Sequence, residues 1–160
     1  MTIEQANVLS QEEFVAELGW VCEHSPWVAE RAWHQRPFAS LEALHQSMTA
    51  AMESASREEQ LALLCAHPEL GSRAPMGAAS TAEQAGVFGG GGSVPAEMIQ
   101  HYRRKFGFPF IFAVKGSSPA DIAVALQIRM DASAEDEFRQ ALWEVSRIAW
   151  FRLQDKFKEI

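Results

Sequence analysis

The stretch AEDEFRQALWEVSRIAWFRLQDKF, residues 134–157, carries the strongest helical pattern in the chain. Its apolar residues recur at intervals of three and four, the spacing that gathers side chains on one face of an α-helix. That face contains Phe138, Leu142, Val145, Ala149 and Leu153. The pattern therefore predicts a long helix packed against an apolar core.

Helix-start signals recur through the rest of the chain. Ser-x-x-Glu capping boxes begin at Ser10, Ser56 and Ser80, and Ser118 is followed by a proline suited to the first helical position. We expect helices near 11–18, 26–35, 40–54, 57–66, 81–86, 95–105, 119–130 and 134–157. The predicted fold is all-α, a single compact domain of about eight helices over residues 1–160.

Two stretches interrupt the helical pattern. AGVFGGGGSVP (85–95) contains four consecutive glycines and predicts a loop. FGFPFIFAVKG (106–116) has a continuous apolar run after Pro109, but no second convincing strand is available to pair with it. We therefore expect a buried extended segment, whose backbone N–H and C=O groups need partners. A ligand could supply some of them.

Composition and charge exclude several classes of protein. The 160 residues are 48% hydrophobic, which favours a packed core over disorder. A net charge of −7, with no large basic face, argues against nucleic acid as a partner. The N-terminal sequence does not resemble a signal peptide, no apolar run is long enough to span a membrane, and two cysteines are too few for a disulfide framework. We expect a cytoplasmic protein.

His67 is the first candidate for chemistry. It precedes Pro68, and a residue before proline is pushed towards extended geometry, so its ring should project from the end of helix 57–66. One interpretation is a histidine stabilised at the helix C-terminus by the dipole. The other is a catalytic acid or base, since the ordinary pKa of histidine suits proton transfer near neutrality.

Metal and thiol chemistry are weaker interpretations. The histidines form no H-x-x-x-H or H-E-x-x-H pattern, and Cys65-x-His67 lacks a second pair to complete four zinc ligands, so we expect no metal site. Cys65 could be a nucleophile with His67 as its base. However, its apolar surroundings, LALLCA, are more typical of a small core residue.

Two further charged side chains are candidates. Glu83, in STAEQ (80–84), completes a capping box, and the first helical turn favours its charged form. If Glu83 faced His67, it would keep the ring protonated and oriented. Arg152 shares the apolar face of the last helix and points inward, either into an internal ion pair or towards an anionic ligand. Arg129, on the apolar face of its own helix, competes for the same role.

Five stretches in order resemble the OHCU decarboxylase family, where OHCU is 2-oxo-4-hydroxy-4-carboxy-5-ureidoimidazoline. They are CEHSPWVAERAWHQRPF (22–38), HPELG (67–71), STAEQAG (80–86), FGFPFIFAVKG (106–116) and ALWEVSRIAWFRLQD (141–155). The resemblance implies an all-α homodimeric enzyme that needs neither metal nor organic cofactor. It also implies conversion of OHCU to (S)-allantoin and carbon dioxide in urate degradation.

The resemblance also implies site residues. The proton donor of the family matches His67, and we assign Glu83 as the catalytic partner that keeps it charged. The substrate-binding positions match Pro68, Ser80, Thr81, Ala82, Gln84, Phe110, Ile111, Phe112, Ala113, Val114 and Arg152. Arg129 has no such match. The alternative from another class is a noncatalytic α-helical binding module with an arginine-lined anion pocket.

Overall fold

The computed structural model describes residues 1–70, 83–85 and 94–158. These residues are mainly helical and contain no β-strand, so the all-α prediction is confirmed. The elements are α1 (Ile3–Val8), α2 (Gln11–Leu18), the 3-10 helix η1 (Gly19–Val21), α3 (Trp27–Trp33), α4 (Leu41–Glu53), α5 (Arg57–Cys65), α7 (Ala96–Phe106), α8 (Pro119–Met130) and α9 (Ala134–Lys158). Within the described ranges no helix is both long and apolar enough to cross a membrane.

The predicted capping residues begin their helices as expected. Ser10, Ser56 and Ser118 each accept a hydrogen bond from the backbone N–H three residues later, and the acidic residue at that position bonds back to the cap. These reciprocal bonds satisfy backbone donors that a helix start leaves without intrahelical partners. The predicted box at Ser80 and most of the glycine-rich stretch lie outside the described residues.

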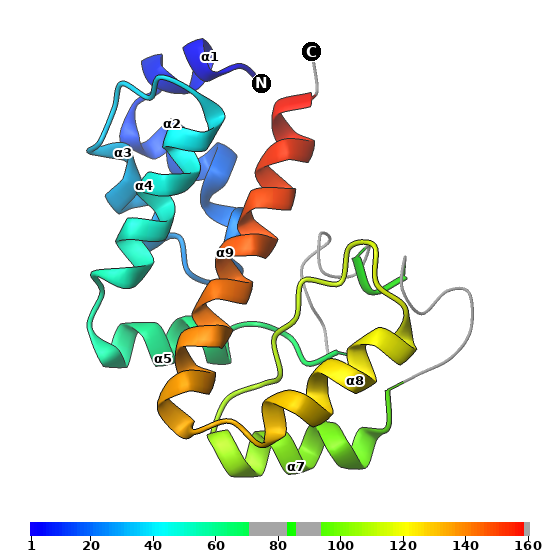
Figure 1. Cartoon of the computed structure of the whole chain (residues 1–160). Helices are drawn as coiled ribbons and strands as arrows, with labels where there is room; N and C mark the ends of the chain where they lie inside the picture. The colour runs from blue at the N-terminus through cyan, green and yellow to red at the C-terminus, as the bar shows by residue number, and fades with distance from the viewer. Residues whose placement is uncertain (71–82, 86–93, 159–160) are drawn as a thin grey trace. The chain divides into compact units, whose positions relative to one another are not determined.

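Chain contacts divide the protein into two units. The first comprises residues 1–66 and the C-terminal part of α9 from Ser146 onward, and the second comprises residues 67–145. The helices α2, α3 and α4 pack together in the first unit, where Phe14, Leu18, Leu44 and Met48 are fully buried (Figure 1).

The second unit has an aromatic core around Tyr102 of α7. The Tyr102 ring lies 4.7 Å from Phe106, 6.0 Å from Phe108 and 5.2 Å from Phe110, measured between ring centroids. The helices α7 and α8 contact one another, and a long non-helical connection joins them (Figure 1).

That connection is the apolar segment whose burial the sequence predicts. Gly107 ends α7 in the left-handed conformation, with φ of 83°, which glycine adopts without steric cost. Residues 107–118 are then neither helix nor strand until Pro119 begins α8. Phe108 and most of the residues that follow, as far as Val114, are buried. The buried segment is therefore confirmed, with helix α7 extending one residue further than expected.

Candidate active site

His67 lies immediately beyond the end of α5. The helix ends at Cys65, Ala66 is its C-cap, and His67 is the next residue, with 6% of its surface exposed. A buried imidazole is shielded from bulk water, which limits proton leakage during a reaction. The position beyond the helix end agrees with the sequence prediction, and the catalytic role of His67 stays a prediction.

Glu69 connects the His67 motif to the helical residues 83–85. The side-chain amide of Gln84 donates a hydrogen bond to the Glu69 backbone carbonyl over 3.2 Å. The Glu69 carboxylate also lies 3.8 Å from Arg103 of α7. Glu83 and Gln84 are both half-buried. Two of the sequence motifs therefore meet in space, although Ser80, Thr81 and Ala82 lie outside the described residues.

The residues from Phe110 to Val114 form the third part of the predicted site, here called the 110–114 segment. Four of its five residues are buried, with exposed fractions between 1% for Phe110 and 6% for Val114. Phe112, at the centre, is half-buried. A segment with so little exposure must satisfy its backbone polar groups internally or with a ligand.

Two buried charged side chains bind the backbone of the 110–114 segment. The Ala113 N–H donates to the Glu144 carboxylate of α9 over 2.9 Å. The Arg129 guanidinium of α8 donates through Nη1 to the Ile111 carbonyl over 2.6 Å. Both bonds involve an ionised group, which makes them stronger than bonds between neutral groups.

Arg129 is held in turn by Glu137. Its Nε lies 2.7 Å and its Nη2 lies 2.5 Å from Glu137 Oε1, and the Tyr102 hydroxyl donates to the same oxygen. Burial raises the pKa of Tyr102, and its hydrogen bond to Glu137 raises it further. The phenol is therefore a neutral donor at physiological pH. These contacts tie the Arg129 guanidinium to internal partners.

Arg152 belongs to the first unit and is also engaged internally. It is 4% exposed, donates through Nη1 to the Val21 carbonyl over 3.0 Å, and lies 3.7 Å from the Glu23 carboxylate. The adjacent Cys22 is fully buried, and burial raises its pKa to about 12 despite the opposing charge of Arg152. The internal ion pair expected of an inward-pointing arginine is present, and substrate binding by Arg152 stays a prediction.

Sequence reasoning missed three buried carboxylates, two of which partner the arginines and one of which binds the Ala113 N–H. Glu137 and Glu144 are 1% and 2% exposed, and Glu23 is 7% exposed. Glu137 and Glu144 lie seven residues apart on α9, so they share a face of the helix. The signal that identified Arg152, a charge on the apolar face, is absent at Glu144, because adjacent residues of a helix are about 100° apart and Glu144 therefore lies off the face that contains Val145. The partners of Glu144 and Glu23 could not be read from the sequence because they lie far away along the chain, and Glu137 meets Arg129 across the junction between two different helices.

The interpretation of Cys65 as a core residue is wrong. Cys65 is exposed although the residues before it, Leu63 and Leu64, are fully buried. It lies in the last turn of α5, where only one side of the helix faces the core. In the described parts of the chain no three His, Cys, Asp or Glu side chains are grouped to hold a metal ion.

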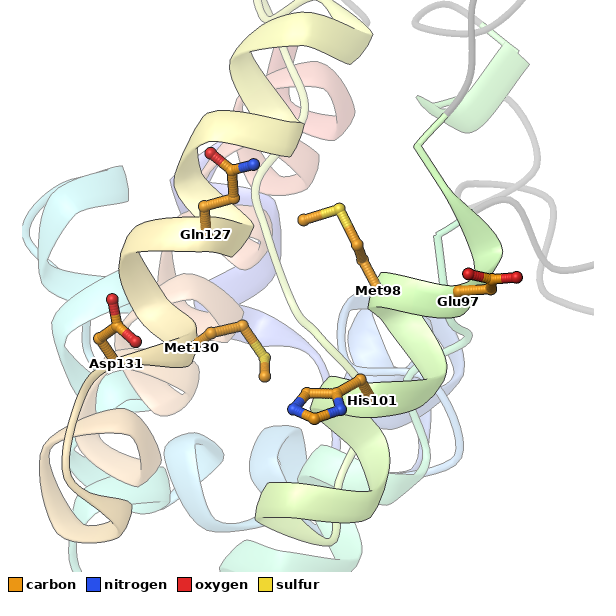
Figure 2. A pocket seen from close by; sticks show the side chains of 6 residues that line it. All are labelled: Glu97, Met98, His101, Gln127, Met130 and Asp131. Atoms are coloured by element: carbon orange, nitrogen blue, oxygen red, sulfur yellow. The ribbon is translucent and has the colours of Figure 1, made fainter.

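A cavity in the second unit lies apart from the predicted site residues. It has a volume of about 440 Å³ and lies between α7 and α8. The side chains of Met98, His101 and Met130 lie between the two helices in Figure 2. The remaining lining residues are Glu97, Gln127 and Asp131. None of the residues assigned by the family resemblance lines this cavity.

Comparisons with known proteins give a consistent result. The family model described as OHCU decarboxylase matches residues 7–154. A protein of Haloferax volcanii named 2-oxo-4-hydroxy-4-carboxy-5-ureidoimidazoline decarboxylase is 48% identical over 98% of this chain and 96% of its own length. A uric acid degradation bifunctional protein of Bacillus subtilis is 41% identical over 99% of this chain, which corresponds to 33% of that protein.

The fold also matches a solved structure. A crystal structure of (S)-allantoin synthase aligns with a TM-score of 0.77 and 30% sequence identity. The alignment covers 98% of this chain and 53% of that one. Sequence and structure comparisons thus agree on one family of enzymes, which sets aside the noncatalytic binding module. The chain belongs to the OHCU decarboxylase family and is a carboxy-lyase.

Proposed function

We propose that this protein decarboxylates OHCU to (S)-allantoin and carbon dioxide as part of urate degradation. The observation that carries the proposal is the family match over residues 7–154, which includes every residue assigned to the site. The names of the relatives supply the substrate, the product and the pathway. We further propose a cytoplasmic homodimer that works without metal or organic cofactor.

The reaction requires control of one proton. Loss of carbon dioxide leaves the electron pair of the broken C–C bond on a ring carbon, and the neighbouring ring C=N accepts it. A proton must then reach the adjacent carbon from one face, while the hydroxyl on the first carbon becomes a carbonyl and its proton passes to the ring nitrogen that accepted the electron pair. Without that control the allantoin would be racemic. His67 as imidazolium supplies this proton, and Glu83 keeps the ring charged and oriented.

The other assigned residues hold the heterocycle. Arg152 provides a positive charge for an anionic group, and backbone groups of the 110–114 segment provide hydrogen bonds. Phe110 and Phe112 stack with a centroid separation of 6.1 Å, and such rings would exclude water from the substrate. Pro68 and the residues from Ser80 to Gln84 complete the proposed set. The buried position of His67 supports this arrangement.

In the assay that tests the proposal, OHCU is generated from urate in the reaction mixture by urate oxidase and hydroxyisourate hydrolase. Decay of OHCU absorbance and the optical activity of the product are followed with and without the protein. We expect faster decay and accumulation of optically active (S)-allantoin, whereas spontaneous decay gives racemic product. Equal decay rates and an optically inactive product in both samples would contradict the proposed function.

A further inference from the structure

Two contacts fix the backbone of the 110–114 segment from the inside of the second unit. Glu144 accepts from the Ala113 N–H, and Arg129 donates to the Ile111 carbonyl. The donor–acceptor distances are 2.9 Å and 2.6 Å. The two side chains come from different helices, α9 and α8, and are 2% and 8% exposed.

The two backbone groups that are held, the Ile111 carbonyl and the Ala113 N–H, belong to alternate residues of the segment. In an extended chain, the N–H and C=O of one residue point to one side, and those of the next residue point to the other. Ile111 and Ala113 are alternate residues, so contacts to both hold the segment along a single side. Phe112 lies between them, and neither of these two contacts uses its N–H or C=O.

Both holding side chains are themselves fixed. Arg129 is bound by Glu137 and lies over the Phe110 ring, with its Cζ 4.5 Å from the centroid. Glu144 also accepts a hydrogen bond from Gln140, one turn earlier on α9, over 3.3 Å. Buried charges with several partners cannot move without leaving polar groups unsatisfied, which carries a large penalty. The contacts therefore define the position of the segment rather than follow its motion.

We propose that Glu144 and Arg129 are positioning residues, which hold Ile111 and Ala113 so that the backbone of Phe112 is presented to the ligand. The ligand part of this inference rests on the proposed function. It also gives Arg129 a role distinct from direct contact with an anion, because its guanidinium is used on Glu137 and Ile111.

The test compares two substitutions of Glu144 with a matched control. Glu144→Gln keeps an oxygen that can accept from Ala113, whereas Glu144→Met keeps the approximate length of the side chain without an acceptor. Glu135→Met makes the same replacement at an exposed position of the same helix. For each protein, KM and kcat on OHCU are measured together with amide hydrogen exchange of the peptide 107–116, at a temperature where circular dichroism shows the fold intact.

We expect Glu144→Met to raise KM by roughly tenfold or more, because the released segment must be ordered again each time the ligand binds. Its kcat should change less, and the peptide 107–116 should exchange faster. Glu144→Gln should restore both KM and exchange to within about twofold of wild type, because the acceptor is retained. Glu135→Met should match wild type. A purely structural Glu144 would lower the unfolding temperature without moving KM.

An unchanged KM in Glu144→Met with faster exchange would overturn the ligand-presenting role, and unchanged exchange would overturn the positioning role altogether. If Glu144→Met does not fold, Arg129→Lys applies the same test. A single ammonium cannot reproduce the forked contacts to Glu137 and Ile111, so the same rise in KM and exchange is expected. A wild-type protein with no activity on OHCU would instead contradict the proposed function, and with it the ligand-presenting role.

Discussion

The two buried arginines, Arg129 and Arg152, differ in their partners. Arg129 binds Glu137 and the backbone of the 110–114 segment, whereas Arg152 lies near Glu23 and binds the Val21 carbonyl. The inward direction of both side chains and their need for partners were predictable from the apolar faces of their helices. The partners were not predictable, because Val21 and Arg152 are 131 residues apart along the chain. Only tertiary packing determines such a pair.

The role of Arg152 can be separated from its ion pair. Arg152→Ala should weaken the binding of (S)-allantoin by roughly ten- to hundredfold, since a hydrogen bond to a charged group contributes about 1.5–3 kcal/mol. Glu23→Gln is the control, because it removes the partner charge and leaves the guanidinium. Isothermal titration and thermal unfolding of both variants provide the measurements. Normal binding by Arg152→Ala with a markedly lower unfolding temperature would make Arg152 a structural residue.

The two cysteines should differ sharply in reactivity. Cys65 is exposed, whereas Cys22 is buried and burial raises its pKa to about 12, so little thiolate forms at pH 8. We expect iodoacetamide to modify Cys65 in the native protein and Cys22 only after unfolding in urea. Peptide mass spectrometry locates the label, and Cys65→Ser should take up none while folded. Modification of both thiols at equal rates would contradict the buried position of Cys22.

Most helix starts were predictable because the signals that mark them are local in the sequence. A capping box depends on residues three positions apart, so it can be identified locally, and it predicted the first residues of α2, α5 and α8. The helix α1 was missed although Thr2 and Gln5 form the same reciprocal bonds. A threonine–glutamine box is a less usual signal than serine with glutamate, and α1 is short. The non-helical segment after α7 was predictable from its continuous apolar run and its proline.

The ion pair between Arg31 of α3 and Glu59 of α5 makes the free energy of unfolding depend on pH. Hydrogen bonds from Arg31 and from the Ser56 backbone lower the pKa of Glu59 from 4.5 to about 2. A lowered pKa means that the contribution is present above pH 4.5 and is lost as the pH falls towards 2. Because the pair is solvent-exposed, its contribution is modest.

We therefore expect Glu59→Gln to reduce the free energy of unfolding at pH 7, with the difference from wild type shrinking as the pH falls from 4.5. Urea unfolding between pH 7 and pH 3 measures that difference. Glu58→Gln, at the neighbouring exposed position of α5, provides the control. A difference between wild type and Glu59→Gln that stays constant over this range would show that the pair does not titrate as described.

The link between the helical residues 83–85 and the His67 motif leads to a further prediction. Gln84 already bonds to Glu69, two residues after His67. If Glu83 supplies its negative charge to the ring, Glu83→Gln should destabilise the imidazolium. The titration midpoint of His67 should then fall, and each pH unit of that fall corresponds to about 1.4 kcal/mol between the two protonation states. Activity should fall most at alkaline pH, where less of the ring stays protonated.

Titration of the ring protons by NMR measures the effect in wild type and Glu83→Gln. His101, an exposed residue of α7, provides an internal control in the same spectra. Equal His67 midpoints in the two proteins would mean that Glu83 is only a helix-capping residue.

At the scale of the whole molecule, the family match covers residues from both units. It spans residues 7–154, and the division between the units falls at His67 and again at Ser146. Local patterns predicted the class of fold, while the order of five motifs along the chain indicated the family. No single motif carried that information, because capping boxes and apolar runs occur in many helical proteins. A single domain over residues 1–160 stays a prediction.

His67 is proposed to deliver the proton that makes the product chiral. Circular dichroism of allantoin formed from OHCU in the presence of wild type or His67→Asn tests this role most directly, with far-ultraviolet spectra confirming that both proteins are folded. Asparagine keeps a polar side chain but cannot donate a proton as an imidazolium does. We expect (S)-allantoin from wild type and, from the variant, racemic product at the spontaneous rate. Optically active product formed by His67→Asn at the wild-type rate would show that His67 is not the proton donor.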